Sequence, residues 1–329
     1  MTLDLIVPHY KEPWETCKYL FDSIAMQRGI DFSNVRVLVV NDGDVVVLDN
    51  EVFAGYPYEV EYIVKEHGGV SAARNYGITH SNADYIMFCD ADDGFLNNYA
   101  LHLIFSAMEE GFDFLISRFV EESVTSEGKK VILPHNSQDA TFVHGKVYRR
   151  EFLIEKEIFF DAEMTLHEDG YFNLIAYTVA KKEGKLKLVE TPLYLWCWNE
   201  NSVVRTNKED FVLRTYADVM KARIGICEEF KRRGYDDALR ASVGMTVLNS
   251  YYDFQKPRYW LPKNDKHRRS AEKAFRKFWV KYKAIFCDLT NKEIFDMSQA
   301  AREQAAQNGM LMERQDFRSW LIHIENDVA

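Results

Sequence analysis

The sequence predicts an α/β protein with a mixed sheet flanked by helices, followed by a helical C-terminal appendage. Two observations predict it. The first ~100 residues alternate apolar, strand-like runs with helical patterns, as parallel sheets covered by helices do. Beyond Thr206 the patterns are long and helical throughout. Because 329 residues exceed a typical domain of ~100 to 200 residues, we expect two domains, 1–205 and 206–329.

The N-terminal elements are expected in the order β-α-β-β-α-β. A helix opens at Pro13 and runs to about Arg28, with Tyr19, Leu20 and Ile24 on one face. A second helix follows the Gly68-Gly69 turn and covers 70–79. The runs at 3–7 and 35–40 are continuously apolar, which is typical of strands covered on both faces. The expected strands are 3–7, 35–40, 58–64 and 85–89.

The order becomes mixed after residue 93, because helical and extended patterns no longer alternate regularly. Helices are expected at 97–109 and 169–181, and extended segments at 112–117, near Val131, at 142–148 and at 186–196. The C-terminal region carries four helical patterns, at 209–231, 236–254, 270–285 and 291–303.

Composition excludes several classes of protein. With 47% hydrophobic and 14% aromatic residues the chain is expected to fold, and its net charge of −10 disfavours a nonspecific nucleic-acid binder. The N-terminus lacks the pattern of a secretory signal, and no apolar run approaches the ~20 residues of a membrane span. The five cysteines are scattered without a CxxC pair, which argues against disulfides and a structural zinc. We therefore expect a cytoplasmic protein.

Three carboxylates close the strand-like run 85–89. Asp90, Asp92 and Asp93 follow it directly, and ligands of open α/β sheets bind at such strand ends. Neighbouring carboxylates repel one another unless a cation screens them, and Mg²⁺ or Mn²⁺ binds carboxylate and diphosphate oxygens together. We expect such an ion to bridge Asp92 to a diphosphate. The alternative is that Asp92 and Asp93 cap the following helix.

Four segments together carry a family resemblance. They are Ile-Val-Pro-His-Tyr at 6–10, Val-Val-Asn-Asp-Gly at 39–43, Gly-Val-Ser-Ala-Ala-Arg-Asn-Tyr-Gly at 69–77 and Phe-Cys-Asp-Ala-Asp-Asp at 88–93. In order and spacing they resemble the nucleotide-binding half of inverting family 2 glycosyltransferases with the GT-A, Rossmann-like fold. The resemblance continues through 144–149 and 167–172 and fades after about Arg205.

The resemblance implies a UDP-sugar site. Pro8 and Tyr10 would border the nucleobase, and Asp42 would accept a hydrogen bond from a uracil N–H. Arg74 would reach the base or the diphosphate, where its charge suits an anionic donor. Asp90 would contact the ribose or a metal-bound water.

The remaining implied roles concern the metal, the base and a lid. Ala91 belongs to the nucleotide-sugar site and Asp92 is the metal ligand. Asp169, in the Glu168-Asp169 pair, resembles the general base that accepts the acceptor's hydroxyl proton, with Glu168 tuning it or binding acceptor. Helix capping is the structural alternative for the pair. His167 either helps to hold metal or acceptor or is structural.

The segment 196–205 resembles one that folds over the diphosphate in relatives. Ser202 and Arg205 would donate hydrogen bonds to its phosphate oxygens. Trp196 and Trp198 either form a sugar-stacking platform or pack against the C-terminal helices.

The segment 256–283 is very basic, with eleven Lys or Arg against Asp265 and Glu272. Its Phe275, Phe278 and Trp279, with Tyr282, share one helical face. The basic side is either solvated or docks an anionic partner. Candidate partners are an anionic cell-envelope glycan or teichoic-acid-like polymer, a lipid-linked glycan with peripheral contact at the inner membrane face, and modified nucleic acid. The C-terminal helices are also candidates for homo-oligomerisation.

Two other classes remain as alternatives to a glycosyltransferase. One is a non-catalytic nucleotide-sugar-binding protein, against which the presence of Asp90, Asp92 and Asp169 argues. The other is a nucleotidyltransferase, which would need a glycine-rich phosphate loop where this chain has His-Tyr-Lys-Glu at 9–12.

Overall fold

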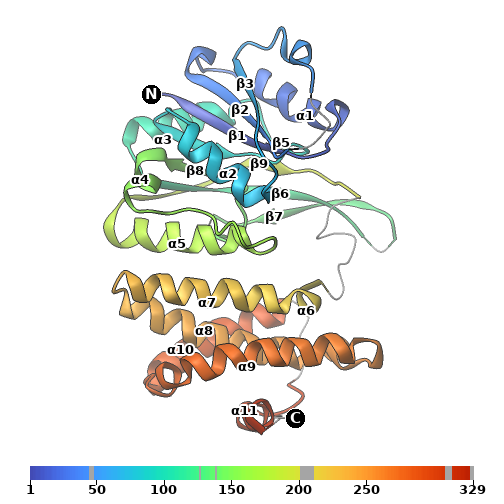
Figure 1. The fold of residues 1–329 in the computed structure, drawn as a ribbon, viewed down its shortest axis with the longest axis vertical. Coiled ribbons are helices and arrows are strands. Elements are labelled where there is room, and N and C mark those ends of the chain that lie inside the picture. Colours follow the sequence, from blue (N-terminus) through green and yellow to red (C-terminus); the bar gives the residue numbers. More distant parts are fainter. Residues whose placement is uncertain (44–47, 126, 138, 201–210, 308–312, 327–329) are drawn as a thin grey trace. The chain divides into compact units, whose positions relative to one another are not determined.

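The computed structural model describes residues 1–329 except 44–47, 126, 138, 201–210, 308–312 and 327–329. The chain divides into two compact units, Met1–Glu200 and Asn201–Ala329, each with its own set of elements (Figure 1). Over the described residues no helix is long and apolar enough to cross a membrane.

The first unit is built on one mixed sheet. Its strands, over the described residues, are β1 (Leu3–His9), β2 (Val35–Asn41), β3 (Glu59–Val64), β4 (Tyr85–Phe88), β5 (Gly94–Phe95), β6 (Phe114–Val124), β7 (Lys130–His135), β8 (Lys146–Arg149) and β9 (Leu186–Trp196). They lie in the order β3-β2-β1-β4-β8-β6-β9-β5, with β7 paired to β6. The expected mixed sheet is confirmed.

The sheet is parallel on one side and mixed on the other. Strands β1 to β4 are mutually parallel where they pair, β8 pairs antiparallel with β4 and β6, and β6 pairs parallel with β9. The chain starts at β1, moves outward to β2 and β3, and then returns to place β4 on the other side of β1. This reversal makes the carboxyl ends of β1 and β4 a topological switch point, where such sheets bind ligands.

Helices flank this sheet (Figure 1). They are α1 (Trp14–Ala25), α2 (Gly69–His80), α3 (Ala100–Glu110), α4 (Arg150–Glu155) and α5 (Glu168–Glu183), with the 3₁₀ turns η1 (Phe32–Asn34) and η2 (Asn50–Phe53). Helix α2 contacts β1 and β2, and α5 contacts β6 and β9. The buried face of α1 includes Leu20 and Ile24, as expected, but Tyr19 is 47% exposed. Position 19 lies 100° from position 20 around the helix, outside the apolar stripe.

The second unit is helical, as expected. Its elements are α6 (Phe211–Arg214), α7 (Tyr216–Arg232), α8 (Asp236–Gln255), η3 (Pro257–Trp260), η4 (Pro262–Asn264), α9 (Asp265–Cys287), α10 (Asn291–Gln307) and α11 (Phe317–Asn326). The predicted aromatic face of α9 is confirmed, because Phe275, Phe278, Trp279 and Tyr282 are buried. Helix α11, which the sequence did not reveal, buries Trp320 against Phe275 with ring centroids 4.9 Å apart.

Candidate active site

Several of the candidate site residues lie at the topological switch point, near the carboxyl ends of β1, β2 and β4. Pro8 lies near the end of β1, Asp42 directly follows β2, and the turn Asp90–Asp93 follows β4. Because β1, β2 and β4 are parallel neighbours, their carboxyl ends meet at one edge of the sheet. The side chains after these strands therefore share one region, as the sequence predicted.

Asp42 organises a turn at this edge. Its two carboxylate oxygens accept hydrogen bonds from the backbone N–H of Gly68 at 2.9 Å and of Gly69 at 2.6 Å, and Lys65 Nζ lies 2.7 Å away. Gly69 has φ of +85°, a conformation that favours glycine. The carboxylate thus holds the loop that leads into α2, and the expected bond from Asp42 to a uracil N–H stays a prediction.

Tyr10 lies beside this turn through His67. The Tyr10 ring is 39% exposed and stacks on the His67 ring, with centroids 5.0 Å apart and planes 26° apart. The His67 Nδ1 in turn lies 2.9 Å from an Asp42 carboxylate oxygen. Tyr10 and Asp42, which the sequence assigned to the nucleobase, therefore belong to one connected group of side chains.

Arg74 is a buried cation that joins three carboxylates. Its Nη1 donates to Asp169 Oδ1 at 2.5 Å and to Glu168 Oε1 at 3.2 Å, while Nη2 donates to Asp90 Oδ1 at 3.0 Å. Burial alone would lower the pKa of Arg74, but these carboxylates outweigh it and raise that pKa. The guanidinium, 3% exposed, thus connects the acidic turn after β4 to the start of α5.

The acid pair stands at the first turn of α5. His167 precedes it with φ of +64°, a left-handed backbone conformation that is unusual for a residue other than glycine. Asp169 Oδ2 accepts from the backbone N–H of Val143 at 3.3 Å, so both of its oxygens face residues outside α5. Burial, followed by the neighbouring Asp169 charge, raises the pKa of Glu168 to about 8.

The three carboxylates after β4 have different surroundings. Asp93 is fully buried, and it accepts hydrogen bonds from the Tyr194 hydroxyl at 3.0 Å and the Cys197 backbone N–H at 2.9 Å. Burial and the charges of Asp90 and Asp92 raise the pKa of Asp93 well above its usual range. Asp93 therefore does not cap a helix but anchors the turn to β9.

Asp92 and Asp90 are less enclosed than Asp93. Asp92 accepts from Asn199 Nδ2 at 2.7 Å, and burial raises its pKa. Burial also disfavours the charged form of Asp90, but hydrogen bonds from His144 and the charge of Arg74 outweigh it and lower the pKa of Asp90. Asp90 is thus the carboxylate of the turn that the protein itself holds ionised.

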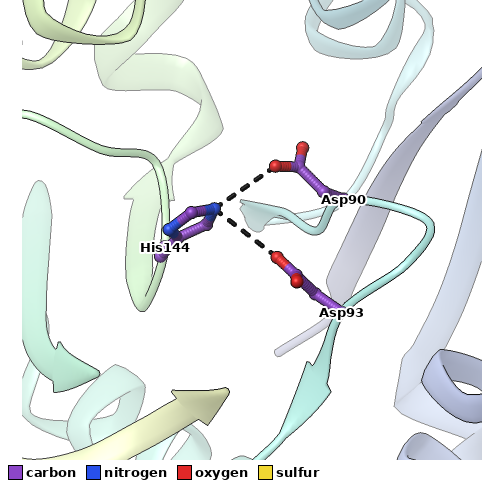
Figure 2. A group of neighbouring side chains, drawn as sticks. All are labelled: Asp90, Asp93 and His144. Carbon is purple, nitrogen blue, oxygen red and sulfur yellow. Dashed lines mark hydrogen bonds and ion pairs between the residues drawn. The ribbon is translucent and has the colours of Figure 1, made fainter. Parts of the chain in front are cut away.

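His144 is a residue of this site that the sequence analysis did not assign. Figure 2 shows Asp90 and Asp93, from the turn after β4, both pointing at one ring nitrogen of His144, from the segment before β8. That nitrogen, Nε2, lies 3.3 Å from Asp90 Oδ2 and 3.5 Å from Asp93 Oδ2. The ring is packed among Phe142, Tyr194 and other aromatic side chains.

Trp196 belongs to the same aromatic group, because its ring centroid lies 5.0 Å from that of His144 and 5.2 Å from that of Phe142. His144 lies in the segment 144–149, which is part of the family resemblance. No role could be assigned to it from the sequence, because Asp90 and Asp93, its partners in the structure, are far from it along the chain.

Lys146 is a second unassigned residue near the acids. It is completely buried, its Nζ donates to the His144 backbone carbonyl at 3.4 Å, and this Nζ lies 5.8 Å from the Phe119 ring centroid. Burial lowers the pKa of Lys146 to about 8, although the charges of Asp139 and Asp169 oppose this. Lys146 is therefore still mostly protonated at pH 7, but it loses its charge at a lower pH than an exposed lysine does.

The local charge balance fits a divalent cation. Arg74 contacts Asp90, Glu168 and Asp169, whereas Asp92 accepts its hydrogen bond from the neutral amide of Asn199. Oxygen-rich carboxylate surroundings suit Mg²⁺ or Mn²⁺. Asp92 and Asp90, which lie at the less enclosed part of the turn, are the residues that fit this role.

Asp90, Asp93 and His144 also place one ligand atom each within 4.8 Å of one another. A metal-bound histidine normally donates its other ring N–H to an acceptor, yet the buried His144 Nδ1 has no hydrogen-bond partner in the described part of the chain. This favours an Nε2–H tautomer, in which His144 donates to the two carboxylates.

The other predicted site residues are placed as follows. Ala91 is buried within the acidic turn, and Pro8 is half-buried in β1. Ser202 and Arg205 lie outside the described residues, so the predicted lid stays a prediction.

The model of the glycosyl transferase family 2 matches residues 4–165. The chain is 28% identical over 223 residues to the glycosyltransferase EpsJ of Bacillus subtilis, covering 61% of this chain and 62% of EpsJ. It is 36% identical over 80 residues to the minor teichoic acid biosynthesis protein GgaB of the same organism, covering 23% of this chain and 9% of GgaB. The chain therefore spans less than two thirds of these relatives.

Among solved structures, the fold is similar to that of S. aureus TarS 1–349 in complex with UDP-GlcNAc. The TM-score is 0.65 at 18% identity, with 94% of this chain and 92% of that chain covered. The similarity shows the same fold, a mixed sheet with flanking helices and a helical C-terminal region.

Proposed function

The chain belongs to glycosyl transferase family 2, and we propose that it transfers a monosaccharide from a UDP-sugar to a hydroxyl group of an anionic cell-envelope polymer, with inversion at the anomeric carbon. One observation carries this proposal. Arg74 joins the carboxylates after β4 to the acid pair at the start of α5, so donor-side and acceptor-side groups meet at one switch point.

Asp169 is the proposed general base. It would take the proton from the acceptor hydroxyl as that oxygen attacks the anomeric carbon, while the nucleoside diphosphate leaves from the opposite face. Arg74 and the Val143 N–H hold one oxygen of Asp169 each, which fixes the direction of the carboxylate. Glu168, with its pKa raised to about 8, would carry a proton at neutral pH and so would not repel Asp169.

Asp92, with Asp90 beside it, would hold Mg²⁺ or Mn²⁺ at the acidic turn. When bound, the ion neutralises charge that develops on the leaving diphosphate. His144 would keep Asp90 and the buried Asp93 oriented as the donor binds.

A uridine nucleotide is the proposed donor base. TarS, which has this fold, is known in complex with UDP-GlcNAc. The Tyr10 ring, 39% exposed and stacked on His67, would border the base at the end of β1, and Lys11 Nζ, 4.5 Å from the ring centroid, would have to give way to a stacked base.

The proposed acceptor class draws support from one relative and one local feature. GgaB is a minor teichoic acid biosynthesis protein, and the segment 256–283 of this chain is strongly basic. An anionic polymer is favoured by that charge, whereas a lipid-linked glycan and modified nucleic acid are alternative acceptors.

The test is metal-dependent release of UDP from a panel of UDP-sugars. We expect at least one UDP-sugar to release UDP with Mn²⁺ or Mg²⁺, and EDTA to stop the release. Calorimetry should show that UDP binds with manganese present and that Asp92→Asn weakens this binding. Absence of UDP binding with manganese would overturn the proposed function, and binding without release would favour a non-catalytic protein.

A further inference from the structure

Six of the eight Lys and Arg residues of α9 fall into two sets, and the first set belongs to the interior of the helical unit. Arg268 Nη1 donates to the buried Glu272 at 2.8 Å, and its guanidinium lies 4.3 Å from the Trp260 ring centroid. Arg276 Nε donates to the Ile324 carbonyl oxygen at 2.6 Å, which ties α9 to α11. These two arginines stabilise the unit, so they are unsuited to docking a partner.

The second set faces solvent along one side of the helix. Lys266, Arg269, Lys273 and Lys277 are all exposed and are separated by three, four and four residues. This spacing places them in a single stripe, which spans about 16 Å at 1.5 Å per residue. We call it the α9 basic stripe.

The stripe is not neutralised by its surroundings. None of its four residues has an ion-pair partner among the residues that the structure describes, whereas Lys281, nearby on α9, pairs with Glu228. Asp265 and Glu272, the two acids of α9, both pair with Arg268 instead. The stripe also begins in the first turn of α9, where the helix dipole already disfavours cations. Such an arrangement favours an anionic ligand over a purely structural role.

The neighbouring side chains favour one kind of anion. The aromatic face of α9 is buried in the unit, so it cannot insert into a lipid surface as interfacial helices do. Trp260 is covered by Arg268 and Arg314, each 4.3 Å from its ring centroid, so it offers no face on which a nucleobase can stack. A flexible polymer with repeated phosphodiesters requires neither apolar insertion nor stacking.

We propose that the α9 basic stripe is a docking surface for a polyol-phosphate polymer, which binds through its successive phosphates. This inference rests on the proposed function, because it assigns the surface that recognises the anionic acceptor. It needs no contact with the nucleotide-sugar site, so the two can be tested separately.

The experiment compares two triple variants of the full chain with equal loss of charge. One is Lys266→Gln, Lys273→Gln and Lys277→Gln. Its matched control is Lys231→Gln, Lys283→Gln and Lys292→Gln, which changes exposed lysines outside the stripe. Binding to a poly(glycerol phosphate) chain is measured at several salt concentrations, with anionic lipid vesicles and single-stranded DNA as competitors.

We expect the stripe variant to bind the polymer at least about tenfold more weakly and to lose about two to three units of the log–log salt slope, while the control changes little. Equal weakening in both variants, or none in either, would overturn the proposal. Tighter binding of vesicles or DNA than of the polymer would also overturn it in favour of those partners. UDP binding by the stripe variant should stay intact; loss of UDP binding by wild type would instead indicate failure of the proposed function.

Discussion

The guanidinium of Arg74 lies 2.5 Å from the carboxylate of Asp169 and 3.0 Å from that of Asp90, although these acids are 79 positions apart in the chain. A single cation from α2 thus sets the distance between the acidic turn after β4 and the first turn of α5. The chemistry that we propose requires this proximity, since the base deprotonates the hydroxyl that attacks the anomeric carbon from which the diphosphate leaves.

Asp169→Asn should lower kcat by about 10³-fold, because an amide cannot accept the hydroxyl proton. The Kd for UDP should change by less than about threefold. Steady-state release of UDP in the presence of acceptor, together with calorimetry, measures both quantities.

Glu168→Gln is the matched control for Asp169→Asn. Because burial and Asp169 raise the pKa of Glu168 to about 8, the neutral glutamine resembles the protonated acid present at pH 7, and kcat should fall by less than about tenfold. A larger loss in Glu168→Gln than in Asp169→Asn would transfer the role of base to Glu168.

Arg74→Lys should weaken UDP-sugar binding by at least about tenfold and lower the free energy of unfolding by about 2 kcal/mol, because one ammonium group cannot bridge three carboxylates. Calorimetry and denaturant unfolding check the two effects. Arg36→Lys is the control: Arg36, near the amino end of β2, pairs with Asp4 of β1, away from the carboxyl ends of these strands. It should lower stability without changing the Kd, and an equal change in Kd in both variants would contradict the assignment of Arg74.

Asp92→Asn should raise the Mn²⁺ concentration for half-maximal UDP release by at least about tenfold, because it removes a charged oxygen ligand. His144→Gln should leave that concentration within about threefold, since the proposed role of His144 is to donate hydrogen bonds. Metal titration of both variants separates the two roles. A loss of metal activation in His144→Gln would make His144 a ligand.

The β6–β7 hairpin should lose stability at high pH through His135. Burial alone would lower the pKa of His135, but hydrogen bonds with Asp139 and Glu121 outweigh it and raise that pKa from 6.5 to about 9. The stabilisation is complete below pH 6.5 and is lost as the pH rises through about 9, because the unfolded chain releases its proton first.

We expect this to change the free energy of unfolding by about 1 to 3 kcal/mol between pH 6 and pH 10. Because Glu168 and Lys146 also titrate in this range, the measured quantity is the difference between proteins: wild type and His102→Gln, an exposed control, should each lose about 1 to 3 kcal/mol more than His135→Gln between pH 6 and pH 10. The same pH dependence in all three proteins would show that His135 is not its source.

Much of the fold was predictable because local pattern and tertiary role agree. Strand β9 has the bounds 186–196 that its sequence suggested, and β1 and β2 are apolar throughout because both faces are covered. The strand β5 was missed because its two residues, Gly94 and Phe95, are too few to show the alternation of apolar and polar residues that indicates a strand. Tyr19 was misplaced because an aromatic residue beside an apolar stripe looks like part of it.

Candidate site residues could be predicted from the sequence only where the residue type alone suggests a chemical role. Asp90, Asp92 and Asp169 could be proposed from the sequence because carboxylates at a strand end or helix start have a clear chemical use, and their roles stay predictions. The role of His144 depends on two carboxylates 54 and 51 positions earlier, and that of Asp93 depends on Tyr194. Such pairings depend on the order of strands in the sheet, which could not be derived from the sequence pattern.

The hydrogen bonds from Tyr194 and Cys197 to Asp93 affect how the proposed enzyme would bind its donor. They clamp the acidic turn to a neighbouring strand before any nucleotide arrives, so this turn is preorganised. Any rearrangement that accompanies donor binding should therefore occur in other segments. The Cys197 amide should exchange its hydrogen slowly whether or not a donor is bound.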